Sequence, residues 1–124
     1  MRALVLVGMG GFVGSVLRYV MSGAAFRLTG IAVFPIGTFA VNVLGCLAIG
    51  FLSGLAETRD VIGPQTRIFL MVGLLGGFTT FSTFGFETFT LVRDAERLYA
   101  LGNILASVAV GLCAVWLGQV LARV

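Results

Sequence analysis

Residues 73–87 read GLLGGFTTFSTFGFE, an apolar stretch in which two adjacent glycines are followed by four hydroxyl side chains. Glycine costs stability inside a helix, and serine and threonine hydroxyls compete for backbone hydrogen bonds. Inside a membrane, a helix breaks only where protein, water or an ion satisfies the freed backbone groups. We therefore expect a break between Gly76 and Ser82, with backbone groups that an ion can use. The alternative is a continuous helix whose hydroxyls bond to the preceding turn.

The composition of the whole chain is typical of a membrane protein. Of its 124 residues, 59% are hydrophobic, 18 are glycine and only 10% are charged. A soluble domain carries about 25% charged residues, and this chain has too few polar side chains to cover such a surface. The composition excludes a soluble globular enzyme and a disordered chain.

Four apolar stretches are long enough to cross a hydrocarbon core about 30 Å thick, which takes roughly 20 helical residues. Segments of about ten residues with alternating polarity, typical of transmembrane β-barrels, do not occur. Glycines interrupt the apolar run after Arg2 and no clear cleavage site follows it, so we do not expect a signal peptide. We predict an all-α membrane protein with one integral domain over residues 1–124 and helices at about 3–24, 36–56, 67–91 and 99–121.

The sequence offers few ligands for zinc or iron. It contains no histidine, and Glu87 is the one acidic residue inside a predicted span. Cys46 and Cys113 fall in different spans, where a buried cysteine usually packs as a small hydrophobic residue. We expect neither a metal site of these side chains nor a disulfide framework.

The eight arginines are divided almost evenly between the two sides of the membrane. One side carries four of them and the other three, plus Arg18 if its side chain reaches that interface. Cytoplasmic loops normally carry a clear excess of positive charge, and that excess sets the orientation. The balance either permits insertion both ways up, so that two copies pair head to tail, or leaves the topology undetermined.

Neutral polar side chains recur on two spans at a spacing of one helical turn. Thr38 precedes Asn42 by four residues on the second span, and Asn103 precedes Ser107 by four on the fourth. Such pairs share a helix face. Their amides and hydroxyls can replace the hydration shell of an anion, or they can bond helices to one another. Both interpretations remain open from the residues alone.

Four further residues, two phenylalanines and two charged residues, have two interpretations each. Phe81 and Phe84 would project to the same side if the helix resumes there, and their partly positive ring edges can meet an anion or simply pack. Arg18 is either part of an electropositive vestibule or an interfacial anchor. Glu87 marks a pore entrance or pairs with an arginine. Three of the predicted spans also carry a pair of glycines four residues apart, a spacing that allows close contact between helices. The pairs are Gly10–Gly14, Gly50–Gly54 and Gly73–Gly77.

Four motifs together are specific for one family. They are GGFVGSVLRY at residues 10–19, PIGT at 35–38, NVLG at 42–45 and GGFTTFSTF at 76–84. With these motifs the chain resembles, over nearly its full length, the Fluc (CrcB) family of small fluoride channels.

The resemblance implies an antiparallel, dual-topology homodimer with two fluoride pores. It also implies a structural Na⁺ at the dimer interface, held by the backbone carbonyls of Gly76 and Thr79 from both copies. Phe81 and Phe84 match the family's pore phenylalanines, and Asn42 matches its pore asparagine.

The remaining positions carried over from the family lie on the first, second and fourth spans. Thr38 and Ser107 match polar pore-lining positions, and Arg18 matches the family's arginine in the first span. The chain departs from the pattern at Asn103, where some members have tyrosine, so the polar lining differs there. Cys46 stands where a small hydroxyl residue is frequent.

The residues and the resemblance together predict a channel, not an enzyme. We expect passive export of fluoride across the cytoplasmic (inner) membrane, and hence fluoride resistance. The expected partners are fluoride, membrane lipid and a second copy of the chain, without nucleic acid or nucleotide. A small dual-topology, proton-coupled multidrug exporter would need a carboxylate in the first span, which this chain lacks. A non-transporting membrane assembly subunit would explain the glycines but not the polar break.

Overall fold

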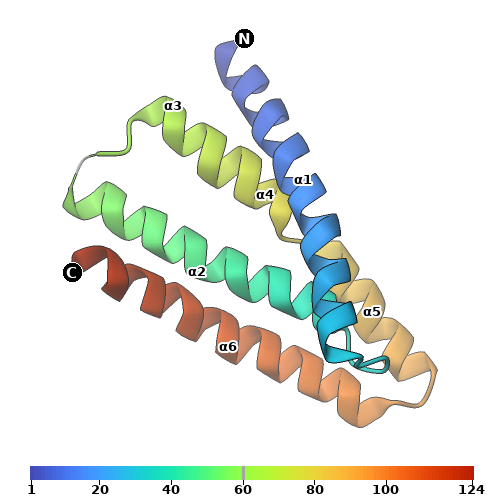
Figure 1. Cartoon of the computed structure of the whole chain (residues 1–124). Coiled ribbons are helices and arrows are strands. Elements are labelled where there is room, and N and C mark those ends of the chain that lie inside the picture. Colours follow the sequence, from blue (N-terminus) through green and yellow to red (C-terminus); the bar gives the residue numbers. More distant parts are fainter. Residues whose placement is uncertain (60) are drawn as a thin grey trace.

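Every regular element of the structure is helical in the part of the chain that the computed structural model describes, residues 1–59 and 61–124 (Figure 1). Four helical segments are long and apolar enough to cross a membrane. They are α1 (Arg2–Thr29), α2 (Ile36–Thr58), a compound segment over Pro64–Arg93 and α6 (Arg97–Arg123). The predicted all-α, four-span fold class is confirmed.

The first helix is longer than its apolar stretch indicates, because it continues beyond residue 24 to Thr29. Gly30 ends it with a φ of 64°, in the left-handed region that glycine adopts without steric cost, and donates its N–H to the carbonyl of Phe26 at 2.9 Å. Arg27 lies in the last turn, where a cation interacts favourably with the helix dipole. Hydropathy marks the membrane-buried length of a helix, whereas capping marks its end.

The third span consists of four consecutive helical pieces. They are α3 (Pro64–Arg67), the π-helix η1 (Ile68–Leu74), α4 (Leu75–Phe78) and α5 (Phe81–Arg93). Pro64 occupies the first turn of α3, where its missing N–H and fixed φ suit a helix start. Arg67 donates to the carbonyls of Ile62 at 3.1 Å and Ala56 at 3.0 Å, which fastens this start to the end of α2.

The α2 and α6 helices lie side by side along most of their length (Figure 1). Glycines permit this contact on both helices. A Cβ on Gly50 would collide with the backbone of Val115, and one on Gly118 would collide with the carbonyl oxygen of Leu47. The Gly50–Gly54 pair therefore packs against α6 within this subunit.

The α1 helix crosses the third span at η1 and α4. A Cβ on Gly10 would approach the Cα of Gly73 to 3.0 Å, and a Cβ on Gly14 would collide with the carbonyl oxygen of Leu74. A Cβ on Gly77 would lie 2.6 Å from the carbonyl oxygen of Gly11. The two remaining glycine pairs of the sequence thus pack against each other.

A small apolar core lies next to the break in the third span. It consists of Val41 from α2 with Leu75 and Phe78 from α4. Many large apolar side chains of α1 and α6 face outward instead. An apolar exterior is expected where a helix contacts lipid or another subunit, and the core fixes α4 against α2 at the level of the break.

Candidate functional site

The third span is interrupted between α4 and α5 by two extended residues. Thr79 has φ −91° and ψ 159°, and Thr80 has φ −150° and ψ 119°. The break therefore lies inside the predicted range, and the continuous-helix alternative is wrong. It is also narrower than predicted, because Gly76 and Gly77 stay helical in α4. The hydroxyl residues, and not the glycines, form the non-helical backbone.

Thr80 starts the new helix with its own side chain. The N–H of Thr83 donates to Thr80 Oγ1 at 3.2 Å, and Thr80 Oγ1 donates to Thr83 Oγ1 at 3.0 Å. This is N-capping, in which a hydroxyl satisfies one of the orphan donors in the first turn of a helix. A threonine directly before a resuming helix is an N-cap signal that the sequence contains, yet Thr80 and Thr83 are absent from the predicted site.

Asn42 on α2 pairs with the Thr80 backbone in both directions. The N–H of Thr80 donates to Asn42 Oδ1 at 2.8 Å, and Asn42 Nδ2 donates to the Thr80 carbonyl at 3.1 Å. Thr79 approaches the same helix through Gly45, since a Cβ on Gly45 would collide with Thr79 Cγ2. The break is thus held against one helix, α2.

Several carbonyl groups at the break have no such partner, and those of Gly76 and Thr79 are among them. The Thr79 N–H and its Oγ1 both donate to the Leu75 carbonyl, each at 3.0 Å. The carbonyls of Gly76 and Thr79 accept no hydrogen bond within the described part of the chain. Gly76 is exposed, and a Cβ there would meet nothing within 4 Å. These are the two groups that the family resemblance assigns to an ion.

Two cavities meet at Thr80. One of about 370 Å³ is lined by Asn42, Gly76, Thr79, Thr80 and Phe81, among others. The second, of about 700 Å³, is lined on α1 by serine, tyrosine and arginine side chains and on the other helices by hydroxyls: Ser15, Arg18, Tyr19, Ser22, Arg27, Thr38, Thr80 and Thr83. Thr80, at the predicted break, therefore borders both the cavity that contains Arg18, the predicted vestibule residue, and the cavity that contains Asn42 and Phe81.

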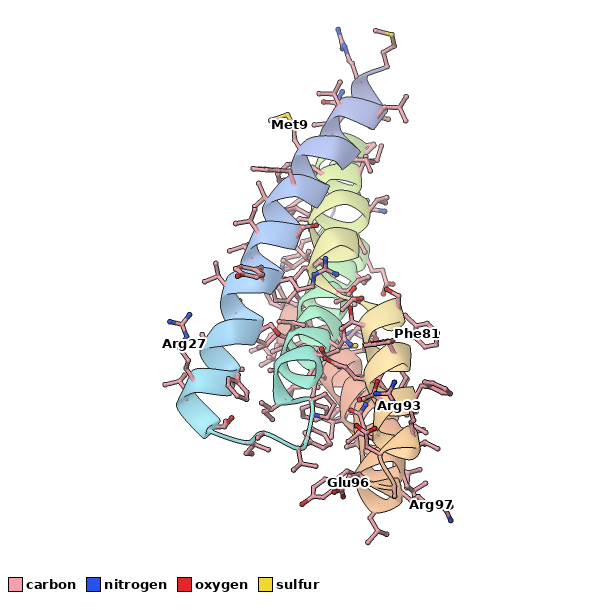
Figure 2. All side chains as sticks on the ribbon, turned by 90° about the vertical axis from the view of Figure 1, so that its right-hand side faces the viewer. Met9, Arg27, Phe81, Arg93, Glu96 and Arg97 are labelled. Carbon is pink, nitrogen blue, oxygen red and sulfur yellow. The ribbon has the colours of Figure 1, made fainter. Side chains whose placement is uncertain are left out.

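Arg18 lies on the wall of the larger cavity, which favours the vestibule interpretation over a purely interfacial anchor. Its guanidinium makes no hydrogen bond or ion pair with the residues that the structure describes. A cation lining a polar hollow raises the local concentration of anions. Arg27, further along α1, lines the same cavity and lies on the side of the molecule away from Phe81 in Figure 2.

Phe81 and Phe84 lie next to each other on the outer side of α5. Their ring centroids are 5.7 Å apart with an interplanar angle of 39°. Phe81 is 83% exposed and points away from the bundle (Figure 2). The two rings share one side of the helix as predicted; Phe84 is half-buried, whereas Phe81 is not covered within this subunit.

Thr38 contacts the carboxylate of Glu87 and so joins α2 to α5. Thr38 Oγ1 donates to Glu87 Oε1 at 2.8 Å, and Thr38 is buried. Glu87 Oε2 and Thr90 Oγ1 are buried without a hydrogen-bond partner among the described residues. Of the two interpretations left open for Glu87, the arginine pair does not occur among the described residues, because its carboxylate accepts from a hydroxyl instead.

Asn103 lies deep between α6 and α5, only 1% exposed. Its Nδ2 donates to Thr88 Oγ1 at 2.9 Å, and its Oδ1 accepts from Ser107 Oγ at 3.4 Å. This chain of three polar residues does not reach the two cavities at the break. Thr88, which completes it, has no sequence signal that singles it out, since its partner comes from another helix.

Comparison with known proteins gives a consistent result along the chain. The model of one family, described as CrcB-like protein, Camphor Resistance (CrcB), matches residues 5–119. A protein of Methylobacillus flagellatus is 46% identical over 95% of this chain and 92% of its own length. A protein of Chlorobaculum tepidum is 48% identical over 99% of this chain and 96% of its own length. A protein of Geobacter sulfurreducens is 44% identical over 99% of this chain and 98% of its own length. All three are named fluoride-specific ion channel FluC.

Proposed function

This chain belongs to the CrcB-like protein family, and we propose on that premise that it is a fluoride-specific ion channel. It is a multi-pass membrane protein whose relatives are named as channels, so it is not an enzyme. Its passive conduction lets fluoride leave the cell across the cytoplasmic (inner) membrane and so gives fluoride resistance.

The observation that carries the proposal is the break in the third span between two hollows. On one side of Thr80 lies the cavity with Arg18, and on the other the cavity with Asn42 and Phe81. A transmembrane helix tolerates non-helical backbone only where protein or a water-filled cavity satisfies it. Neutral donors line both hollows, and such donors replace the water around an anion without binding it irreversibly.

The proposed fluoride route begins at Arg18, which concentrates anions in the larger cavity. Asn42 then offers an amide N–H in place of water, and Thr38 offers its hydroxyl once the hydrogen bond that it donates to Glu87 Oε1 rearranges. The edges of Phe81 and Phe84 follow, with the partly positive hydrogens of each ring facing the ion. Fluoride is small and strongly hydrated, so closely spaced donors along a narrow route favour it over chloride.

Three further residues extend the proposed route. Glu87 lies beside Thr38 at 2.8 Å and marks an end of the pore. Asn103 and Ser107 form the polar lining contributed by α6. In the isolated subunit they bond to Thr88 and to each other, so their use by fluoride requires these hydrogen bonds to rearrange.

A second copy completes the channel as an antiparallel, dual-topology homodimer with two pores. Two observations support this arrangement. Phe81 is 83% exposed, and an isolated aromatic ring on the surface is no route for an ion until another surface faces it. The nearly equal arginine counts on the two sides of the membrane remove the usual bias toward one orientation.

A structural Na⁺ fits the break of such a dimer. Na⁺ is a hard cation that binds oxygen, and unwound backbone carbonyls serve as its ligands in transporters. The Gly76 and Thr79 carbonyls are free of hydrogen bonds within the described residues and line one cavity. One copy offers two such carbonyls and two copies offer four. The bound ion would add positive charge between the subunits and join them.

Fluoride efflux from proteoliposomes tests the function. Purified protein is reconstituted with internal fluoride or chloride, and valinomycin with K⁺ removes the electrical limit on efflux. We expect fast fluoride release, negligible chloride release and no effect of an imposed proton gradient. Flux that follows the proton gradient would favour an exporter, and no flux from folded protein would favour an assembly subunit; either result would refute the channel.

A further inference from the structure

The side chain of Asn42 makes the same two hydrogen bonds to the Thr80 backbone that a neighbouring β-strand would make to an extended residue. It accepts the Thr80 N–H at 2.8 Å and donates to the Thr80 carbonyl at 3.1 Å. Both groups lose their helical partners where the span breaks, and a buried unpaired backbone group is costly. One amide side chain therefore satisfies both backbone groups of a residue that is only 9% exposed.

This pairing uses the Thr80 carbonyl and, by engaging the Thr80 N–H, leaves the Gly76 carbonyl without its helical donor. The Thr80 carbonyl is used by Asn42, whereas those of Gly76 and Thr79 remain without a hydrogen bond in the described residues. Thr80 also caps α5 through its side chain. The backbone of one residue is therefore fixed to α2 while its side chain fixes the start of α5 and hence the position of Phe81.

We propose that Asn42 is a positioning residue, whose amide bonds to Thr80 in order to hold the break open and to hold Phe81 at the pore. This inference rests on the proposed function for its effect on fluoride. The role assigned to Asn42 is to fix the backbone of Thr80. Its remaining amide N–H is still available to contact an ion. The geometry requires an amide of this length, because both atoms at its end are needed.

Substitutions of Asn42 should act on the Thr80 backbone in a graded way. Aspartate retains an acceptor for the Thr80 N–H but, when ionised, has no donor for the Thr80 carbonyl. Serine is one heavy atom shorter and does not span both groups. Asn42→Ser should therefore release both bonds and Asn42→Asp only one.

Isotope-edited infrared spectroscopy measures the pairing directly. A ¹³C=¹⁸O carbonyl is placed at Thr80 by semisynthesis, and at Thr79 in a matched control, in the full chain reconstituted in lipid. We expect the Thr80 band to move to higher frequency in Asn42→Ser and in Asn42→Asp, while the Thr79 band keeps its position. An unmoved Thr80 band in both variants would overturn the inference, whatever the fluoride flux.

The functional part of the inference is tested by the Na⁺ dependence of flux. In Asn42→Ser the Na⁺ concentration for half-maximal flux should rise by about tenfold or more, as loss of buried hydrogen bonds predicts. Phe81→Ile should instead lower the maximal flux and leave that concentration unchanged. A shifted Thr80 band in Asn42→Ser with unaltered flux and Na⁺ dependence would overturn the positioning role. Absence of fluoride conduction by the unsubstituted chain would refute the proposed function and leave the infrared result to decide the pairing.

Discussion

The hydroxyl of Thr38 on α2 donates a hydrogen bond of 2.8 Å to Glu87 Oε1 on α5. Thr38 is 5% exposed, and the other carboxylate oxygen is buried without a partner in the described part of the chain. The contact joins α2, whose Asn42 bonds to the break, to α5, which carries the two phenylalanines proposed to line the pore. It is also the sole hydrogen bond that the Glu87 carboxylate makes among the described residues.

Thr38→Val should lower fluoride flux, because valine keeps the shape of the side chain and removes the donor. A buried acceptor that loses its partner costs about 1–3 kcal/mol, which corresponds to a loss of about five- to 150-fold in flux if the contact forms during conduction. Thr38→Ser keeps the hydroxyl and should conduct nearly as the unsubstituted chain does. Proteoliposome efflux measures all three, and equal flux in the valine and serine variants would show that the hydroxyl is not needed.

Phe81→Ile and Phe84→Ile should each reduce fluoride flux by about tenfold or more, since an aliphatic side chain lacks the partly positive ring edge. Phe86 and Phe89 lie on the same helix and are 68% and 65% exposed. Phe86→Ile and Phe89→Ile are therefore matched controls that should retain flux. Size-exclusion chromatography should show the same assembly for all four variants. If the two sets of variants lose flux equally, the pore does not depend on Phe81 and Phe84 in particular.

Gly14→Ala should destabilise the subunit, because the added methyl group would collide with the Leu74 carbonyl oxygen and lie 2.9 Å from the Phe78 nitrogen. Backbone atoms cannot move aside as a side chain can, so the cost should reach or exceed the roughly 1–3 kcal/mol of ordinary overpacking. Gly8→Ala is the control, since a Cβ at Gly8 meets nothing within 4 Å. Thermal unfolding in detergent should place the midpoint of the Gly14 variant clearly below that of the Gly8 variant.

Replacing Na⁺ by N-methylglucamine throughout purification should weaken the dimer and abolish fluoride flux. The large organic cation cannot enter a site formed by four carbonyl oxygens. Returning Na⁺ should restore both properties. A dimer with full flux in the complete absence of Na⁺ would contradict the proposed metal site, while leaving the fluoride pathway itself unaffected.

Much of the fold follows from sequence because it depends on local properties of the chain. Apolar length predicts the four spans, and the run of hydroxyl residues after Gly77 predicts a break. The ends of α1 and the π-helix η1 were not predictable in the same way. Gly30 ends α1 through its backbone conformation. The wide turns of η1 coincide with the close contact between Gly10 and Gly73, which is a relationship between distant segments.

The site was predictable as a set of residue types but not as a set of contacts. The sequence left two roles open for Asn42, and the structure shows the amide bound to a backbone group. It likewise left open whether Glu87 marks a pore entrance or pairs with an arginine, and in the structure the carboxylate accepts from Thr38. Partners from other helices decide these roles, and their identity depends on helix rotation, which the spacing of polar residues does not determine.

The most direct test of the account is the reversal potential of the protein in a planar lipid bilayer with opposing fluoride and chloride gradients. A fluoride-selective channel should reverse at the equilibrium potential of fluoride, which is about 59 mV in magnitude for a tenfold gradient of a monovalent ion. The reversal potential should follow fluoride when chloride or pH is changed on one side. A current that reverses at the chloride or proton potential, or no current from assembled protein, would contradict the assignment of this chain as a fluoride channel.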